Sequence, residues 1–350
     1  MQKTMKGLAL PGDKSVELLE VPVPEIKPTE VLVRIKAAAI CGSDLHHYFR
    51  KRDESVPRFI VGHEPCGVIE KLGSEVTGLA VGQRVAMYHW GGCGKCKFCA
   101  KGEYKHCANR VGFGSVEKHG GDTEFMAVTP EQSIYPLPDN LTFEDGALIA
   151  CNAGTAYGAL KKIGINSALD LCIYGLGPVG LATAIIARAM GVKKIYAMDP
   201  NPDRRKFAEE LGVDVTLDSS EEAVEKLIEM THGGVARQIE TSGSIRAQQA
   251  IVRTAGKHGR IAVVGMSGLY DTSNGVNLSQ LIQNEIMITG SHVMNRDEFI
   301  ELIELCSEKE IHFDKLITHR YALVEADEAM KEFSQGNVGK SIFVFDTDEA

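Results

Sequence analysis

The sequence predicts an α/β protein of two domains, one rich in β-strands and one built on a doubly wound parallel sheet. The chain has 350 residues, more than the roughly 250–300 residues that a single hydrophobic core usually serves. Short β-branched runs interrupted by Gly and Pro fill about the first 150 residues, as in a compact β-rich unit. From Leu169 onward, strand-like and helix-like segments alternate, which is typical of a parallel sheet covered by helices.

The β-rich domain is expected to contain strands over residues 30–40, 67–73, 83–90 and 123–130, followed by a helical pattern over 143–160. A predicted helix at 297–307 and a predicted strand at 341–346 come after the alternation of strands and helices has stopped. We expect these two elements to return to the β-rich domain. That domain is therefore predicted to comprise residues 1–151 and 295–350, which leaves residues 152–294 for the other domain.

The second domain begins with a strand, a Gly-rich turn, a helix and a strand over residues 169–199. Further strand-like segments occupy residues 213–218, 237–243, 259–266 and 286–293, and a helical pattern covers 220–232. Strands that alternate with helices in this way are connected by crossovers and run parallel. The sequence therefore predicts a doubly wound sheet.

The turn GLGPVG lies directly after a strand and opens an apolar helix. Glycines at this spacing permit a tight turn, close approach of the backbone to a pyrophosphate, and close packing of helix on strand. Taken alone, the motif also fits a purely structural turn. The next strand ends at Asp199, where an acid can accept hydrogen bonds from the ribose hydroxyls, so a Rossmann-type dinucleotide site is predicted. Its residues in the turn are Gly175, Gly177, Pro178, Val179 and Gly180.

Asp199 also favours one dinucleotide over the other. A carboxylate at this position repels a 2′-phosphate, which favours NAD over NADP. Arg204 and Arg205 follow soon after and would suit a 2′-phosphate, although a solvated helix face is the favoured explanation for them. NAD is the predicted cofactor.

Composition narrows the kinds of partner. The chain is 44% hydrophobic and 24% charged, with a net charge of -9, and it has no apolar run near the roughly 20 residues of a membrane span. The net negative charge repels nucleic-acid phosphates and anionic lipids, so a small-molecule partner is favoured. The first residues lack the apolar core of a signal peptide, and we expect a cytoplasmic protein.

Four of the nine cysteines follow the pattern C-x₂-C-x₂-C-x₇-C. A cytosolic chain with an odd number of cysteines favours metal binding over disulfides. Four thiolates in one short loop match a closed, structural zinc site, while an iron–sulfur cluster is the competing interpretation. The predicted ligands are Cys93, Cys96, Cys99 and Cys107, whereas Cys66, Cys172 and Cys306 fit ordinary buried thiols.

Other candidate ligands are scattered: Cys41, His63, Glu64 and Cys151. Each has a simpler explanation as a buried thiol or a satisfied polar group, and sequence spacing does not assemble them. Asp44 is more plausible as a group that orients a ligand or its loop than as an acid or base.

The motifs CGSDLH, GHEPCGVIEKLG, the four-cysteine loop, ACNAGTAYGAL and GLGPVG occur in one order along nearly the whole chain. In this respect the chain resembles the zinc-dependent medium-chain alcohol and polyol dehydrogenases. The resemblance implies a GroES-like catalytic domain beside the Rossmann domain. It implies a catalytic zinc bound by Cys41, His63 and either Cys151 or water, with Glu64 close by or exchangeable. Cys151 matches the alcohol branch, whereas CGSDLHHY is closer to the sorbitol branch.

The same resemblance implies the chemistry. Zinc would make the substrate hydroxyl acidic, hydride would pass to NAD, and Ser43 and His46 would relay the proton, with Thr155 against the nicotinamide. The expected reaction is the reversible oxidation of a secondary alcohol of a polyol, sugar or cyclitol to a ketone by a homo-oligomer, a tetramer or a dimer. A simple alcohol dehydrogenase is the alternative, and a silent nucleotide-binding member is less favoured. Candidate substrate contacts are His47, Tyr48, His89 and Trp90.

Overall fold

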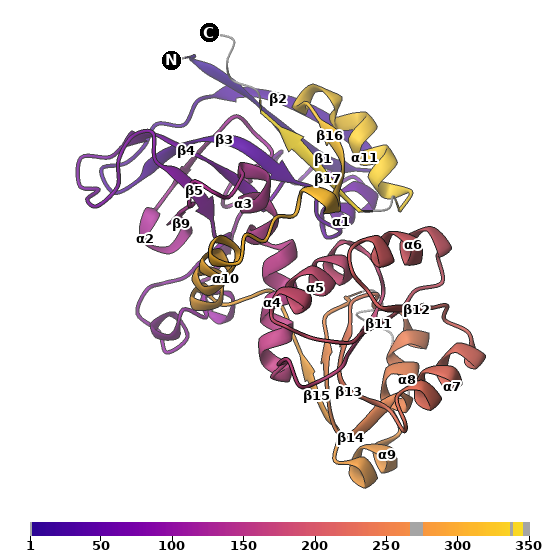
Figure 1. Ribbon diagram of the computed structural model, residues 1–350. Helices are drawn as coiled ribbons and strands as arrows, with labels where there is room; N and C mark the ends of the chain where they lie inside the picture. The colour runs from indigo at the N-terminus through magenta and orange to yellow at the C-terminus, as the bar shows by residue number, and fades with distance from the viewer. Residues whose placement is uncertain (1, 267–275, 337–338, 346–350) are drawn as a thin grey trace. The chain divides into compact units, whose positions relative to one another are not determined.

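The structure, a computed structural model, describes residues 2–266, 276–336 and 339–345. The chain forms two compact units. Unit 1 comprises Met1–Asn152 and Asn295–Ala350, and unit 2 comprises Ala153–Met294, so the first division lies one residue after the position we predicted. Figure 1 labels the elements of both units.

Unit 1 is built on a seven-stranded sheet. The strand order is β16 (Ile317–Tyr321), β17 (Lys340–Val344), β3 (Val31–Ala39), β4 (Pro65–Leu72), β5 (Arg84–Met87) and β9 (Ile134–Pro136), with β8 (Phe125–Val128) also pairing with β3. Because β17 lies beside β3, the C-terminal segment completes the N-terminal sheet. The predicted strand 341–346 corresponds to β17, and its last residue, Asp346, lies outside the described residues.

A hairpin of β1 (Thr4–Gly12) and β2 (Ser15–Pro22) was not predicted. Its strands contain Gly and Pro, which obscured the alternation of apolar and polar residues. Asp13 and Lys14 form the turn with φ of 51° and 59°. Their N–H groups donate to the carbonyls of Arg50 and Tyr48, which fastens the hairpin to the end of α1 (Asp44–Phe49).

The helical pattern over 143–160 proved to be two helices. Helix α3 (Phe143–Ala150) starts with a capping box of Thr142 and Asp145, which satisfies the first free N–H groups of the helix. Cys151 ends the helix with φ of -145° and ψ of -57°, outside the helical region. Helix α4 (Asn152–Ile163) follows at once. The helical pattern is therefore confirmed on both sides of Cys151, and the break between the two helices falls on a candidate metal ligand.

Short elements complete unit 1. They are β6 (Trp90–Gly91), β7 (Val111–Gly112), α2 (Pro130–Ser133), α10 (Arg296–Glu308), α11 (Ala326–Ser334) and the 3₁₀ turns Cys99–Lys101, Tyr104–His106, Asp314–Leu316 and Leu323–Glu325. The core of the unit includes Val33 and Ile35 from β3 and Phe343 from β17, all fully buried. The central strands of the sheet thus supply the core against which the site is built.

Unit 2 contains a parallel sheet of six strands, as the alternating pattern predicted. Their order is β12 (Val215–Leu217), β11 (Ile195–Met198), β10 (Leu171–Tyr174), β13 (Val235–Glu240), β14 (Ala255–Val263) and β15 (Met287–Gly290). The helices of this unit, besides α4, are α5 (Pro178–Ala189), α6 (Pro202–Glu210), α7 (Glu221–Met230), α8 (Ile245–Arg253) and α9 (Leu278–Asn284). The order reverses direction after β10, and such a switch point is where open α/β sheets bind ligands.

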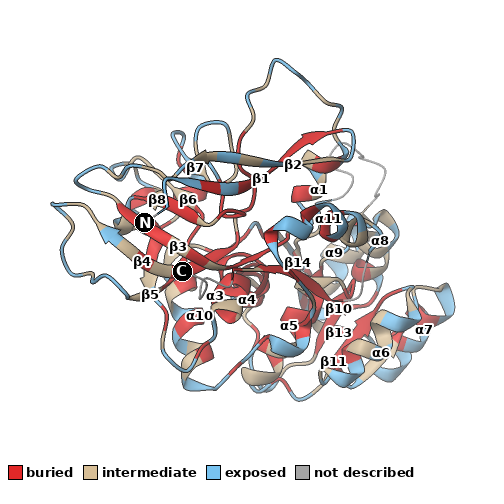
Figure 2. Cartoon of the chain, turned by 90° about the horizontal axis from the view of Figure 1, so that it is seen from above, coloured by how far each residue is buried: buried red, intermediate tan, exposed pale blue. Residues whose placement is uncertain are grey.

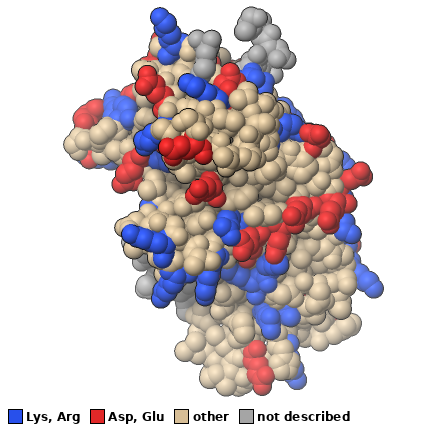
Figure 3. Space-filling view, turned by 90° about the vertical axis from the view of Figure 1, so that its left-hand side faces the viewer, with Lys and Arg blue, Asp and Glu red and all other residues tan. Residues whose placement is uncertain are grey.

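Burial follows the sheets. Strands such as β10 and β11 are buried along their whole length, while α6 and α7 carry many exposed residues (Figure 2). Acidic and basic side chains are interspersed on the face shown in Figure 3, which does not resemble the uniformly basic surface that binds a phosphate backbone. Among the described residues, no helix combines the length and apolar character that crossing a membrane requires.

Candidate functional site

Three neighbouring strands of unit 1 bring distant residues to one place. Strand β3 ends two residues before Cys41, and β4 starts directly after His63 and Glu64. The pairing is fixed by hydrogen bonds from Ala39 N to Glu64 O at 3.2 Å and from Ile40 N to Ser341 O at 3.0 Å. The order β17-β3-β4 therefore gathers the ends of three chain segments at one edge of the sheet.

At this edge the structure places Cys41, His63, Glu64 and Cys151 together. One potential ligand atom from each lies within 4.8 Å of the others. Tetrahedral zinc with bonds of about 2.0–2.3 Å holds its ligand atoms roughly 3.3–3.8 Å apart. Two sulfurs, one nitrogen and one carboxylate oxygen, largely removed from solvent, fit this ion after a small contraction. The fourth candidate, Cys151, comes from the break between α3 and α4.

Asp44 supports two members of this cluster. Its side chain is 5% exposed; Oδ2 accepts a hydrogen bond from Cys41 N at 2.8 Å, and Oδ1 lies 3.4 Å from His63 Nδ1. A carboxylate on the nitrogen away from the metal fixes the orientation of a histidine ligand and strengthens it as a donor. The geometry agrees with the orienting role expected for Asp44.

Electrostatics at the cluster favour a cation. A hydrogen bond from Cys151 and the neighbouring His63 hold the pKa of Cys41 well below its usual value, despite burial. Burial lowers the pKa of His63, but the Cys41 thiolate and the Asp44 carboxylate outweigh it, and the net pKa is raised. The cluster thus presents a thiolate beside an imidazole, a carboxyl group and a second thiol within 4.8 Å of one another, which are the donors that zinc binds.

Lys340 is a further member that the sequence analysis missed. Its Nζ donates a hydrogen bond to Glu64 Oε1 at 2.9 Å and also lies 2.9 Å from Oε2. The side chain of Lys340 is 2% exposed and that of Glu64 is 0% exposed. Burial raises the pKa of Glu64 to about 8 although Lys340 opposes it, and a bound cation would lower it again. A lysine at the start of a strand is ordinarily a surface residue, so no local signal in the sequence marks it.

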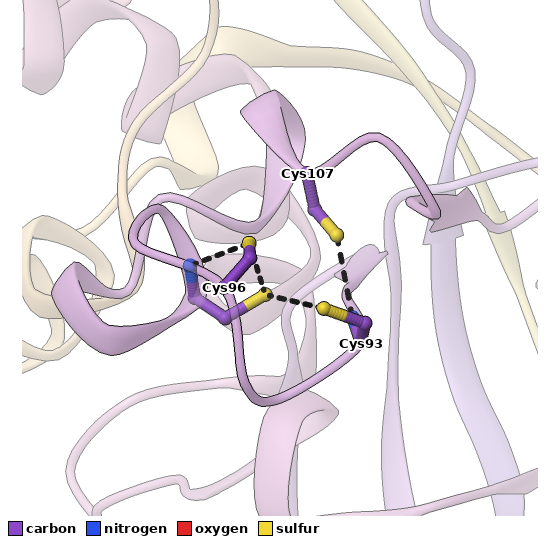
Figure 4. A group of neighbouring side chains, drawn as sticks. Cys93, Cys96 and Cys107 are labelled. Atoms are coloured by element: carbon purple, nitrogen blue, oxygen red, sulfur yellow. Dashed lines mark hydrogen bonds between the residues drawn. The ribbon is translucent and has the colours of Figure 1, made fainter.

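The four-cysteine loop forms a second cluster in unit 1. Potential ligand atoms of Cys93, Cys96, Cys99 and Cys107 lie within 4.8 Å of one another, and Figure 4 shows the sulfurs converging from the loop. Backbone N–H groups of Cys93 and Cys99 point at the sulfurs of Cys107 and Cys96, at 3.4 and 3.5 Å. N–H donors and tetrahedral spacing suit four thiolates around zinc, with no position left for a substrate.

In unit 2, the glycine turn links β10 to the N-terminus of α5. Gly175 has φ of 91°, and a Cβ on Gly180 would lie 2.0 Å from the Gly175 carbonyl oxygen. Both positions therefore require glycine. Gly177 caps α5, Pro178 is its first residue and Val179 follows; a Cβ on Gly177 would meet nothing within 4 Å. That open space beside free helical N–H groups fits a phosphate.

Asp199 lies at the end of the neighbouring strand β11 and is 3% exposed. Its Oδ2 accepts from Leu176 N in the glycine turn at 2.7 Å, and its Oδ1 accepts from Asn201 N at 2.8 Å. Arg205 Nη1 donates to the Asp199 carbonyl oxygen at 2.7 Å, so its guanidinium is anchored to the backbone. Thr155, 8% exposed, lies on α4 in the same unit.

The remaining predicted residues fall into two groups. His89 is 4% exposed, and its ring centre lies 5.2 Å from that of His63, while the Trp90 ring lies 5.5 Å from that of His89 and is tilted against it by 49°. Ser43, at the start of α1, and His46 are exposed, and His47 contacts Phe59.

Tyr48 was expected in the substrate pocket. Instead it is 5% exposed and packs in the hydrophobic core of unit 1, because it occupies the inner side of α1. A cavity of about 470 Å³ elsewhere in unit 1 is lined by Lys118, Gln132 and others, but by none of the four clustered ligands. We therefore assign the functional site to the clusters of candidate ligands and not to this cavity.

Comparison with known proteins identifies the family. Residues 27–139 match the alcohol dehydrogenase GroES-like domain, and residues 178–308 match the zinc-binding dehydrogenase domain. The zinc-type alcohol dehydrogenase-like protein YphC of Escherichia coli K12, which is uncharacterized, is 31% identical over 98% of this chain and 99% of its own. An L-threonine 3-dehydrogenase of Rhizobium rhizogenes is 31% identical over 92% of this chain and 93% of its own.

A solved structure agrees. Galactitol-1-phosphate dehydrogenase from Escherichia coli superimposes with a TM-score of 0.88 at 27% identity, covering 97% of this chain and 100% of that one. The chain belongs to the zinc-dependent alcohol and polyol dehydrogenase family and is an oxidoreductase of that family. The predicted combination of a GroES-like and a Rossmann-type domain is confirmed.

Proposed function

We propose that this protein is a zinc- and NAD-dependent dehydrogenase that reversibly oxidises a secondary alcohol of a polyol, sugar or cyclitol to a ketone, with hydride passing to the nicotinamide. The observation that carries the proposal is the convergence of Cys41, His63, Glu64 and Cys151 in a chain of this family. When bound there, zinc acts as a Lewis acid that makes a substrate hydroxyl acidic near neutral pH. The four-cysteine loop would hold a second, structural zinc.

The residues in and around the cluster have separate roles in this proposal. Cys41, His63 and Cys151 present the donor atoms, and Asp44 orients the first two of them. Ser43, the N-cap residue of α1, accepts the hydroxyl proton on Oγ in this proposal and gives up its own through the ribose hydroxyl of the nicotinamide to the ring of His46. Both side chains are exposed, one before the short helix α1 and one on it, which suits delivery of a proton to solvent.

NAD is the proposed cofactor because of how Asp199 is held. Its carboxylate is fixed beside the glycine turn by backbone N–H groups, and a negative charge fixed there repels a 2′-phosphate. Arg205, one of the two arginines that would counter this charge, already donates to backbone carbonyls. Gly175, Gly177, Pro178, Val179 and Gly180 would hold the pyrophosphate, and Thr155 would contact the nicotinamide.

We expect Asp199→Asn to narrow the preference for NAD over NADP by about tenfold, because the amide no longer repels the 2′-phosphate. Steady-state kcat/KM with each cofactor measures the ratio. The Asn side chain keeps one oxygen that can accept the hydrogen bond from Leu176 N in the glycine turn. A melting curve measures any stability that is lost if this hydrogen bond breaks. Asp203→Asn, an exposed acid of α6, is the matched control. An unchanged ratio would remove Asp199 from the ribose site.

The side chains near the cluster favour a hydroxyl-rich substrate over a bare alkyl chain. His89 carries polar ring atoms next to His63, Trp90 lies next to His89, and His47 lies on α1. The named substrates of two similar proteins, L-threonine and galactitol 1-phosphate, are likewise alcohols with polar neighbours. A simple alcohol dehydrogenase remains the second candidate, because Cys151 at the cluster matches the ligand of that branch.

An assay panel separates these candidates. The purified protein with its zinc is tested against polyols, cyclitols, sugar phosphates, L-threonine and simple alcohols by NADH absorbance. A kcat/KM at least about 100-fold higher for a polyol or cyclitol than for ethanol or 2-propanol is the expected result. Turnover of simple alcohols alone supports the alternative, and no turnover with two zinc ions bound contradicts a dehydrogenase function.

We also propose that the chain associates with copies of itself, on the basis of exposed apolar residues in unit 2. Among the described residues of unit 2, β15 is the last strand in the sheet order, and Met287 and Ile288 on it are 55% and 37% exposed. Leu278 and Ile282 of α9 are 67% and 77% exposed. An open edge with apolar residues is suited to pairing with a second copy, so we propose a cytoplasmic homodimer or homotetramer. Sedimentation velocity that gives a monomer would contradict it.

A further inference from the structure

Lys340 is buried where a lysine is rarely found. The residue is 1% exposed, and it stands at the first position of β17, 276 residues along the chain from Glu64. Burying an ammonium group costs several kcal/mol or more unless a partner compensates it. A cost of this size at one edge of the sheet indicates that Lys340 has a task at the metal cluster.

The charges of the cluster show what Lys340 compensates. Metal binding requires both thiols to lose their protons, and the thiolates of Cys41 and Cys151 together with the Glu64 carboxylate then exceed a divalent cation by one negative charge. Lys340 carries one positive charge and is within Coulombic reach of all three. Asp44, also buried, adds to the negative side. Without Lys340, the full cluster would therefore hold an uncompensated negative charge in a site of low dielectric constant.

The geometry also places Lys340 in competition with the metal for one oxygen. Nζ hydrogen bonds to Glu64 Oε1. Oε2 lies at the same distance, 2.9 Å, but accepts no hydrogen bond within the described part of the chain, and it is completely buried. Glu64 is also one of the four clustered candidate ligands. Both carboxylate oxygens thus lie 2.9 Å from Nζ, and an ion that binds one of them has to draw it away from Lys340.

We propose that Lys340 is a positioning residue that holds the Glu64 carboxylate and so decides how readily Glu64 occupies the fourth ligand position of the metal. While Lys340 holds Glu64, the position is open to the oxygen of a substrate or of water. When Lys340 is absent, Glu64 closes the site. This inference depends on the proposed metal-dependent function, and its test therefore measures metal ligation separately from turnover.

The test uses the full-length protein with cobalt in place of zinc, whose visible spectrum reports coordination. Imidazole, a small neutral ligand, is titrated against wild type, Lys340→Met and Lys340→Gln. Cobalt held by the four-cysteine loop has no open position and does not respond. We expect both variants to bind imidazole more weakly, by at least about tenfold for Lys340→Met, because Glu64 then occupies the position. Lys340→Arg should recover most of the wild-type affinity.

Two further variants test whether Lys340 affects imidazole binding through Glu64. Glu64→Gln added to Lys340→Met should bring imidazole binding back to within about threefold of wild type, since the competing carboxylate is gone. Lys71 is an exposed lysine of β4, and Lys71→Met is the matched control, which should leave the affinity for imidazole unchanged. Lys340→Gln replaces the charged donor of Glu64 with a neutral one, which holds a carboxylate more weakly, and it serves if Lys340→Met does not fold.

The outcomes separate this inference from the proposed function. Wild-type imidazole affinity in whichever of the two Lys340 variants folds overturns the role of Lys340, while cobalt bound at the Cys41 cluster keeps the metal assignment. Weakened binding that Glu64→Gln does not reverse also overturns it. Failure of wild type to bind metal outside the four-cysteine loop contradicts the proposed function itself.

Discussion

Cys41→Ser is expected to lower kcat/KM by at least about 1000-fold and to leave the fold and NADH binding nearly unchanged. Serine keeps its proton at neutral pH and is a poor zinc ligand, whereas the pKa of the Cys41 thiol is held well below its usual value by Cys151 and His63. The dinucleotide residues belong to unit 2, which has its own sheet and core.

Three measurements check this result. Metal analysis should show the zinc content falling from two ions to one per chain, NADH fluorescence should report an unchanged dissociation constant, and the assay panel should show the loss of turnover. Cys66→Ser is the matched control. Cys66 is a buried thiol of the same unit that donates to Val85 O at 3.1 Å, a bond that a serine hydroxyl can replace. An active Cys41→Ser protein would contradict the catalytic metal assignment.

The second large effect concerns stability. Cys96→Ser is expected to release the zinc of the four-cysteine loop and to lower the melting temperature by on the order of 5–10 °C, because binding of a structural zinc contributes directly to folding free energy. Cys96 Sγ lies 3.5 Å from Cys99 Sγ and accepts from Cys99 N, so its loss removes a ligand and frees the turn.

Activity should fall much less in Cys96→Ser than in Cys41→Ser when it is assayed well below the lower melting temperature. Differential scanning calorimetry and zinc analysis give the two numbers. Lys95→Ser changes an exposed residue between two of the ligands and should keep both zinc content and stability. Unchanged melting with the loop zinc retained would show that Cys96 is not a ligand.

Local patterns predicted much of the secondary structure. The predicted strand 30–40 is β3 and the predicted helix 220–232 contains α7, because alternation and helical periodicity are local properties. The β1–β2 hairpin was missed because Gly7 and Pro11 interrupt its pattern. The helical pattern over 143–160 is confirmed, but it did not reveal the break at Cys151, because apolar periodicity continues across a break that tertiary packing imposes.

The candidate sites differ in how far the sequence revealed them. Cysteines 93, 96, 99 and 107 are close in sequence, so one short loop is enough to bring them together. The glycine turn is likewise contiguous. Cys41, His63 and Cys151 were assigned to one site only through resemblance to a family, since their spacing carries no geometric information. Lys340 was indicated neither by sequence spacing nor by resemblance to a family.

The sequence by itself determined the composition class, the two kinds of domain, the glycine turn and the four-cysteine loop, because each depends on residues within a few positions of one another. Only the tertiary structure decided that Cys151 interrupts a helix, that Tyr48 belongs to the core, and that Lys340 meets Glu64. Those facts follow from the strand order β17-β3-β4 and from side-chain packing. Non-local pairing of this kind is set by the free energy of the whole sheet, and short stretches of sequence do not encode it.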